Sequence, residues 1–454
     1  MEEINSKTHV LVLPCPVQGH INPIVQFSKI LASKEVKVTI LTIDFVCKAM
    51  LLDCGPLINI ESIPHEAIPV EGVDNFLEWF QTLMLEKFSG IVEKFGDSEY
   101  PVKVVVIDSL ITWIIDLAHE LGLKVAALHT QPVALSVLYY HIDQEDSTNK
   151  IPFECSVPVS LSSLPLLEKE DLPSFICETH AYPIVKRLAF GQNFNFKKAD
   201  WLYMTVFDWS RIKFNKEKRV VNWLRTQYSI KTIGPVVLSI YLDKEYDSSL
   251  TKPHYETCKK WLDSREIGSV IYVSFGSLVS LREKQMEELA FGLIMSNSYF
   301  LWVVRDTEEN KLPNEFKSKA SEKGLIVDWS PQLDVLAHKS IGCFFSHCGW
   351  NSTLEALILG VPMVCMPQWV DQPTNAKFIS DIWRTGIRVK AGKDGVITRE
   401  EIASSIKEVM VEKKGVMLKE NAIKWKILAK EAIDKGGSSY KNIEEFIEAC
   451  NALN

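Results

Sequence analysis

Short runs of aliphatic and β-branched residues recur along the 454-residue chain, and segments with helical spacing separate them. In the first half, the runs at 9–13, 37–43 and 103–107 are apolar at most positions, as in the central strands of a parallel sheet. Helical spacing over 23–33 and 111–121 follows the first and third runs. This alternation predicts an α/β domain built on a parallel sheet.

The same alternation begins again in the second half, with strand-like runs at 269–275 and 341–346. We therefore expect two doubly wound domains that face each other, with a ligand cleft at the carboxyl ends of their strands. The predicted segments are an N-terminal Rossmann-like domain over 1–238, a polar linker over 239–256, a C-terminal Rossmann-like domain over 257–435 and a final helical segment over 436–454 that packs back on the first domain.

The composition narrows the class of protein. Hydrophobic residues make up 46% of the sequence, charged residues 24%, and the formal net charge is −8, as in many soluble globular proteins. Without a basic stripe, a nucleic-acid partner is not expected. No apolar stretch reaches the ~18–20 residues of a membrane-spanning helix, and the acidic N-terminus does not resemble a signal peptide. Ten cysteines without a CxxC pair predict buried, reduced thiols. We expect a cytoplasmic protein, by default a monomer.

Several cofactor and metal motifs are missing from the sequence. It contains no GxGxxG after a strand, no HExxH and no GxSxG. It also lacks an Asp-x-Asp pair, which could hold a divalent ion beside a sugar nucleotide. The sequence therefore predicts neither a metal site nor a tightly bound cofactor.

The segment 329–372 contains the largest group of candidate ligand-binding residues in the sequence. His347 follows the strand-like run at 341–346, Gly349 allows a sharp turn, and Ser352 and Glu355 have the spacing of a capping box at the start of a helix. Backbone N–H groups and the helix dipole make such a turn a site for phosphate. On these residues alone, Ser352 and Glu355 could instead be a plain helix cap, and His347 a core histidine.

The same segment resembles the signature segment of plant family 1 UDP-glycosyltransferases. The likeness extends to Pro16–Pro23, to the strand that ends at Ser277 and to Gly436–Ser439, so it covers essentially the whole chain. Ser330 is a departure, because the family commonly has alanine there. The resemblance implies a GT-B fold. The matching positions in the signature segment are Trp329, Gln332, His347, Gly349, Trp350, Asn351, Ser352, Glu355, Pro367, Asp371 and Gln372.

The resemblance also implies a role for each part of the donor site. Trp329 would stack on uracil, with Gln332 and the backbone of Ser330 beside the base, and Glu355 would accept from the ribose hydroxyls. The diphosphate would be held by Ser277, His347, Asn351 and Ser352. The sugar hydroxyls would be bound by Trp350, Asp371 and Gln372. The family usually pairs glutamine at the last position with glucose, so UDP-glucose is the expected donor.

Two residues of the first half are candidates for proton transfer. His20 follows the first strand after a glycine turn, and Asp108 directly follows the strand-like run at 103–107, so both should lie at one edge of the sheet. An imidazole oriented by a carboxylate can act as a general base near neutral pH. From position alone, both could simply cap helices. Both match the family's catalytic positions, which implies an inverting, metal-independent transfer to an acceptor hydroxyl that forms a β-glucoside.

The first half of the chain contains apolar and aromatic residues, and one threonine, that are candidates for binding the acceptor. An apolar pocket there would suit a phenolic, a steroid or a triterpenoid, and a glucose ester of an acid stays open. Two other functions also stay open, a nucleotide-sugar epimerase and a non-catalytic nucleotide-sugar-binding protein. The candidate acceptor residues are Trp79, Phe80, Met84, Thr130, Phe175 and Phe194.

Overall fold

The computed structural model describes residues 8–44, 58–64, 72–96, 98–143, 158–177, 182–208, 216–237, 253–320 and 322–453. The chain forms two compact units. The first comprises Met1–Lys169, Phe175–Leu238 and Glu431–Asn454, and the second comprises Glu170–Ser174 and Ser239–Lys430. Most of the predicted linker lies outside the described residues, and helix α9 (Pro253–Asp263) begins within its last part.

The first unit contains a parallel seven-stranded sheet of order β3-β2-β1-β4-β5-β6-β7. The strand order reverses between β1 and β4, which pair with Leu13 opposite Ile107. Ligand sites of doubly wound sheets lie at the carboxyl ends of the strands at such a reversal. The strands are β1 (His9–Leu13), β2 (Lys37–Ile43), β3 (Ile58–Ile63), β4 (Val102–Asp108), β5 (Lys124–His129), β6 (Trp201–Met204) and β7 (Ile230–Thr232).

Two helices of the first unit differ from the prediction. Helix α1 begins at Gln18 rather than near Pro23, because the Val17 carbonyl already accepts helical hydrogen bonds from the N–H groups of His20 and Ile21. The single helix predicted over 111–121 is a 3₁₀ turn followed by a short α-helix. The helices are α1 (Gln18–Ser33), α3 (Val73–Gly96), η1 (Ser109–Ile114), α4 (Ile115–Glu120), α5 (Val133–Asp143), η2 (Lys169–Asp171), α6 (Ser174–Cys177), α7 (Pro183–Asn195), η3 (Phe196–Lys198) and α8 (Lys216–Gln227).

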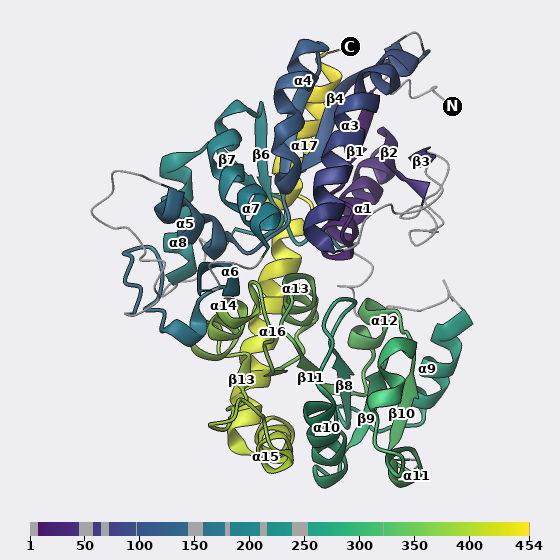
Figure 1. Cartoon of the computed structure of the whole chain (residues 1–454), viewed down its shortest axis with the longest axis vertical. Helices are drawn as coiled ribbons and strands as arrows, with labels where there is room; N and C mark the ends of the chain where they lie inside the picture. Colours follow the sequence, from purple (N-terminus) through teal and green to yellow (C-terminus); the bar gives the residue numbers. More distant parts are fainter. Residues whose placement is uncertain are drawn as a thin grey trace. The chain divides into compact units, whose positions relative to one another are not determined.

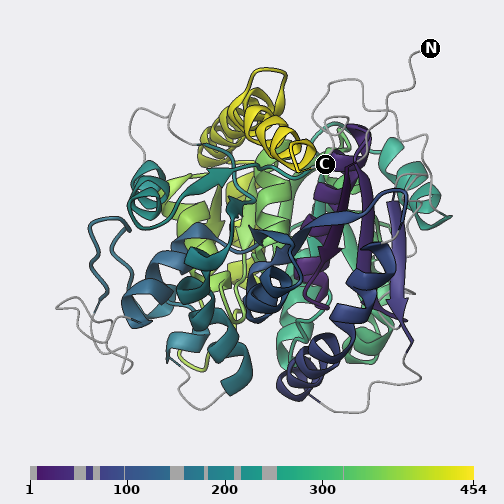
Figure 2. The same cartoon turned by 90° about the horizontal axis from the view of Figure 1, so that it is seen from above.

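The C-terminal helix α17 (Ser438–Asn451) belongs to the first unit (Figure 1). The Phe446 ring on α17 lies 6.1 Å from that of Phe27, 5.7 Å from that of Trp201 and 5.3 Å from that of Tyr203. Near the end of α17, Asn451 accepts a hydrogen bond from the Thr8 hydroxyl, and in the view from above the C-terminus lies beside the purple first strands (Figure 2). The last residues of the chain thus complete the core that the first residues begin.

The second unit contains a parallel six-stranded sheet of order β10-β9-β8-β11-β12-β13, which reverses between β8 and β11. Its strands are β8 (Val270–Ser274), β9 (Tyr299–Val303), β10 (Gly324–Val327), β11 (Ile341–Ser346), β12 (Met363–Cys365) and β13 (Gly386–Arg388). Its other helices are α10 (Glu283–Met295), η6 (Asp306–Lys311), α11 (Phe316–Ala320), α12 (Gln332–Ala337), α13 (Trp350–Leu359), α14 (Gln372–Lys377), the π-helix η7 (Phe378–Ile382) and α15 (Arg399–Met410), while α16 (Lys413–Ile433) continues past its boundary.

Two sequence predictions about the whole chain can be compared with the described residues. None of their helices is long and apolar enough to cross a membrane. The free cysteines among the described residues are buried, as expected for small apolar side chains within apolar strands and helices. Cys177, at the end of α6, is disulfide-bonded and departs from the prediction of reduced thiols.

Candidate functional site

His20, Asp108 and Thr130 form a hydrogen-bonded cluster at the strand reversal of the first sheet. The Asp108 carboxylate is fully buried at the end of β4, and its Oδ1 accepts from the Leu110 N–H at 2.8 Å. Its Oδ2 lies 2.9 Å from Nδ1 of His20 and accepts from the Thr130 hydroxyl at 2.8 Å. These donors offset the cost of burying the carboxylate.

The cluster fixes the tautomer of His20. An ionised carboxylate only accepts hydrogen bonds, so the proton of a neutral imidazole lies on Nδ1 and the lone pair on Nε2. The His20 side chain is 17% exposed and lies in the first turn of α1. An imidazole held in this way can accept a proton at Nε2 from a hydroxyl. Thr130, a candidate acceptor residue in the sequence, contacts both Asp108 and His20, with its hydroxyl 2.8 Å from Nδ1.

In the second unit, His347 stands at the end of β11 with its ring against two glycines. Burial lowers the pKa of His347 to about 4, so the ring is neutral at pH 7. A Cβ atom at Gly276 would lie 2.9 Å from Cε1 of this ring, and one at Gly349 would lie 2.6 Å from Nε2. The positive φ of the turn is at Cys348, at 66°, whereas Gly349 has a φ of −56°. The glycine expected for the turn is therefore needed for space beside the imidazole.

The resemblance implies that His347 holds the diphosphate of UDP. On that expectation, replacing Gly349 with alanine should weaken UDP binding about 10–100-fold, because the added methyl displaces His347 and removes a hydrogen bond to a charged group, about 1.5–3 kcal/mol. Isothermal titration with UDP measures the effect. Gly191→Ala is the matched control, since a Cβ there meets nothing within 4 Å. Equal UDP affinity in the Gly349→Ala variant would remove His347 from the diphosphate site.

The predicted capping box is wrong. Helix α13 begins at Trp350 with Gly349 as its N-cap and no side-chain cap, so Ser352 lies inside the first turn. The side chains of Ser352 and Glu355 bind Gln332 instead, whose Nε2 donates to the Ser352 hydroxyl at 2.9 Å and to Oε2 of Glu355 at 2.7 Å. No side chain caps the N-terminus of α13, and the dipole of this helix favours an anion at that end.

Glu355 is half-buried, and its carboxyl group has no cationic partner among the described residues. Burial raises the pKa of Glu355 to about 7, and the hydrogen bond from Gln332 opposes this only in part. A carboxyl group in this state gains from additional hydroxyl donors when it ionises. The Gln332–Ser352–Glu355 group therefore has the chemistry to bind a diol such as that of ribose.

The residues around the predicted base site are positioned by β10 and α12. Trp329 lies between them with 41% of its surface exposed, which leaves indole area for stacking. Ser330 is buried and its hydroxyl lies 3.0 Å from that of Tyr272, so its side chain serves the interior. Only its backbone can act in the expected contact with a base.

Arg305 is a residue that the sequence analysis missed. Its guanidinium donates to the carbonyls of Ser277 and Val279 in the loop after β8. This fixes the backbone beside the strand reversal, where Ser277 is exposed. No sequence signal connects Arg305 with this loop, because the contact depends on the pairing of β8 with β9.

Two of the three predicted sugar residues, Asp371 and Gln372, lie at the start of α14. The Oε1 atom of Gln372 accepts from the N–H groups of Gln368, at 2.9 Å, and Trp369, at 3.1 Å. Its Nε2 is then the part of the side chain that can donate to a sugar hydroxyl. Asn375, also missed by the sequence analysis, donates to Oδ2 of Asp371 at 2.6 Å and to the Cys348 carbonyl at 2.9 Å, so it links the sugar residues to the His347 turn.

Trp350 and Asn351 are the first two residues of α13. The Trp350 indole is only 8% exposed and its ring lies 6.4 Å from that of Trp383. This packing leaves the Trp350 backbone N–H, rather than the indole face, as the group suited to a ligand. Asn351 is half-buried beside it.

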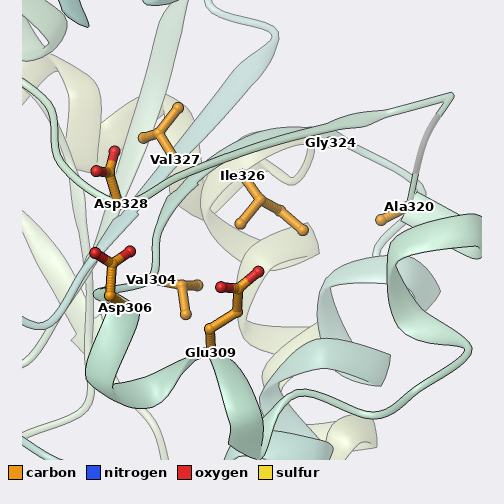
Figure 3. A pocket seen from close by; sticks show the side chains of 8 residues that line it. All are labelled: Val304, Asp306, Glu309, Ala320, Gly324, Ile326, Val327 and Asp328. Carbon is orange, nitrogen blue, oxygen red and sulfur yellow. The ribbon is translucent and has the colours of Figure 1, made fainter.

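A pocket of about 360 Å³ opens beside β9 and β10 (Figure 3). It contains the carboxylates of Asp306, Glu309 and Asp328, which would repel a diphosphate. Asp328 also accepts from the N–H of Trp329 at 2.9 Å. This pocket is therefore unsuited to the phosphates of a nucleotide, and none of its lining residues was a sequence candidate.

The candidate acceptor residues are spread over the first unit. Phe80 and Met84 are buried on α3, and the Phe80 ring lies 6.5 Å from that of Trp113 on η1. Trp79 is half-buried and stacks on Phe76. The remaining two differ in burial, since Phe175 is 5% exposed and Phe194 75% exposed. The structure thus brings the α3 residues together with η1 and leaves Phe194 at the surface.

Known proteins resemble this chain over nearly its whole length. The model of the family described as UDP-glucoronosyl and UDP-glucosyl transferase matches residues 112–432. The chain belongs to the plant family 1 UDP-glycosyltransferases. UDP-glycosyltransferase 74E2 of Arabidopsis thaliana is 44% identical, over 97% of this chain and 98% of the relative, and mogroside I-E synthase of Siraitia grosvenorii is 43% identical over the same shares.

Solved structures of this family confirm the fold class of two Rossmann-like α/β domains. Os79 of O. sativa, in complex with U2F and trichothecene, superposes with a TM-score of 0.86 at 32% identity, over 97% of this chain and 100% of that chain. UGT2 of Phytolacca americana, with UDP-2fluoro-glucose and pterostilbene, gives a TM-score of 0.84 at 25% identity, over 98% and 99%. This UDP-glycosyltransferase therefore transfers a glycosyl group from a UDP-sugar to an acceptor. Membership of this family favours glycosyl transfer over the two alternative functions, a nucleotide-sugar epimerase and a non-catalytic binding protein. Within the described residues, no group of three or more His, Cys, Asp or Glu side chains could hold a metal ion.

Proposed function

We propose that this UDP-glycosyltransferase is an inverting, metal-independent enzyme that moves glucose from UDP-glucose to a hydroxyl of a small apolar molecule. The observation that carries the proposal is the His20–Asp108–Thr130 cluster, in which Nδ1 of His20 lies 2.9 Å from the buried carboxylate. Nε2 accepts the proton of the acceptor hydroxyl, and its oxygen attacks the anomeric carbon while UDP leaves from the opposite face. The α-linked donor then gives a β-glucoside.

The His20 cluster supports proton transfer without a covalent enzyme intermediate. Asp108 stabilises the imidazolium as it forms, because its Oδ2 already faces Nδ1 at the strand reversal. Thr130 donates to the same oxygen and limits rotation of the carboxylate. The general base is thus oriented before the acceptor arrives, and such assistance contributes about 10²–10⁴ in rate.

The donor half of the proposal is supported by the second unit. Neutral His347, the N-terminal N–H groups of α13 and the hydroxyls of Ser277 and Ser352 supply hydrogen-bond donors for the diphosphate without a cation. Glucose as the sugar is supported by Gln372, whose amide Nε2 is directed to donate because its Oε1 binds two backbone N–H groups.

An apolar acceptor is supported by side chains on η1, which follows Asp108, and on α3, which contacts η1 through one aromatic pair. Helix η1 begins directly after Asp108 and carries Trp113, whose ring lies 6.5 Å from that of Phe80 on α3. Buried Met84 lies one turn further along α3. Aromatic and thioether groups of this kind suit a flat or polycyclic alcohol that has few polar groups. The acceptor residues proposed are Trp79, Phe80, Met84, Phe175 and, at the base itself, Thr130.

Incubation with UDP-glucose and a panel of phenolics, steroids, triterpenoids and carboxylic acids tests the proposal. We expect a mass gain of one hexose on a hydroxylated apolar acceptor and an anomeric proton coupling typical of a β-glucoside. UDP-galactose in a parallel reaction should be the poorer donor. Faster transfer from UDP-galactose, or an α-glucoside as the product, would contradict the proposal.

A further inference from the structure

Val370 has a backbone conformation that is rare for its residue type. Its φ is +57°, and it directly precedes the predicted sugar residues Asp371 and Gln372. A β-branched side chain in the left-handed region is an outlier, and such a residue keeps its conformation only when its surroundings hold it there. The direction in which the chain enters α14 depends on this φ.

Ser174 forms hydrogen bonds with both backbone polar groups of Val370, the N–H and the carbonyl. The Ser174 hydroxyl accepts from the Val370 N–H at 2.8 Å, and the Ser174 N–H donates to the Val370 carbonyl at 2.9 Å. The two residues are 196 positions apart in the sequence. This paired contact fixes the peptide planes on both sides of the Val370 Cα.

The short segment Glu170–Ser174, here called the strap, is anchored to the second unit at its other end by Asp171. The Asp171 side chain is 8% exposed and accepts from Arg388 at 2.9 Å and from Lys377 at 3.1 Å. Its carbonyl accepts from the hydroxyl of Thr374 at 2.7 Å. The strap therefore holds the start of α14 at two places, Val370 and Thr374, on either side of Gln372.

We infer that Ser174 is a positioning residue for the donor sugar, which acts through Val370 to orient Asp371 and Gln372. The inference rests on the proposed function, because it assigns those two residues to the sugar. The strap comes from the first half of the sequence, and Phe175, the next residue, is a proposed acceptor residue. A residue outside the signature segment thus sets how the glucose is held.

The test is Ser174→Ala, assayed with UDP-glucose and UDP-galactose. The acceptor is the compound of the panel above that gains a hexose, at a saturating concentration. We expect kcat/KM for UDP-glucose to fall about 5–20-fold and the preference for glucose over galactose to narrow, because Gln372 is no longer held in place. The Kd for UDP should stay within about twofold, since Trp329, Gln332 and Glu355 bind the nucleoside elsewhere. Ser174→Thr keeps a hydroxyl and should restore at least half of the lost kcat/KM.

A double substitution tests the route through Val370. Glycine tolerates the left-handed conformation, so Ser174→Ala should cost at most about twofold in the Val370→Gly background. An equal loss in both backgrounds would overturn the inference, as would normal kcat/KM in Ser174→Ala. Ser404→Ala, an exposed serine on α15, is the matched control and should behave as the unmodified protein.

Gln372→Ala separates this inference from the function on which it rests. If Gln372→Ala weakens use of UDP-glucose and Ser174→Ala does not, the inference fails and the donor assignment stands. If Gln372→Ala leaves the KM for UDP-glucose unchanged, both fail. Thermal melting of each variant, which should stay within a few degrees of the unmodified protein, separates loss of position from loss of fold.

Discussion

Replacing His20 with alanine should lower kcat for glycosyl transfer about 10²–10⁴-fold, the usual contribution of a positioned general base. The acceptor hydroxyl then has to lose its proton to water, while the donor site in the second unit is unchanged. UDP binding should therefore stay within about twofold of the unmodified protein. Steady-state kinetics with a saturating acceptor and titration with UDP measure the two quantities.

His119→Ala is the matched control for this substitution. His119 lies on α4 of the same unit, 37% exposed and 3.0 Å from Asp200, away from the proposed site. Its removal should leave kcat within about twofold. Near-normal turnover in the His20→Ala variant would show that another group accepts the proton, whereas a parallel loss of UDP affinity would point to a folding defect.

The second large effect concerns Glu355. Burial raises the pKa of Glu355 to about 7. Ribose hydroxyls that donate to the ionised carboxylate favour deprotonation, so UDP affinity should fall as the pH drops below about 7, by up to about tenfold per pH unit. Replacing Glu355 with glutamine should weaken UDP binding about 10–100-fold at pH 8, the cost of losing hydrogen bonds to a charged group of about 1.5–3 kcal/mol. Titration calorimetry with UDP between pH 5.5 and 8.5 checks both effects.

The stability of the UDP-free protein provides the control, because it changes in the opposite direction. The pKa of Glu355 is higher in the folded chain than in the unfolded chain, so the folded state binds the proton more tightly. Its contribution to stability is complete below the ordinary glutamate pKa and is lost as the pH rises towards about 7. Glu355→Gln should therefore melt at a higher temperature than the unmodified protein at pH 8 and at a similar temperature at pH 5. An unchanged pH dependence of UDP binding in Glu355→Gln would assign the effect to the phosphates of UDP.

Much of the fold could be predicted because buried parallel strands appear in the sequence as short, nearly continuous apolar runs. The runs predicted at 9–13, 37–43 and 341–346 are β1, β2 and β11 with the same bounds. The proximity of His20 and Asp108, 88 positions apart, also followed from topology, since both stand at the carboxyl edge of neighbouring strands. Family resemblance then supplied the assignment of the donor residues.

The remaining features depend on contacts that have no local signal. Ser352 and Glu355 have the spacing of a capping box, yet Gln332 competes for both side chains once α12 packs on α13. Asn375 is one more polar residue on a helix until its amide is seen between Asp371 and the Cys348 carbonyl. Such roles are set by tertiary packing, which overrides local preference.

The discontinuity of the first unit has a consequence for engineering within this family. Because the Phe446 ring on α17 packs against those of Phe27, Trp201 and Tyr203, exchanging the whole first unit between two relatives takes more than a single crossover near the middle of the gene. A chimera would have to inherit its final helix from the same parent as its opening strands. Otherwise the aromatic residue of the final helix from one parent would have to pack against aromatic residues from the other parent.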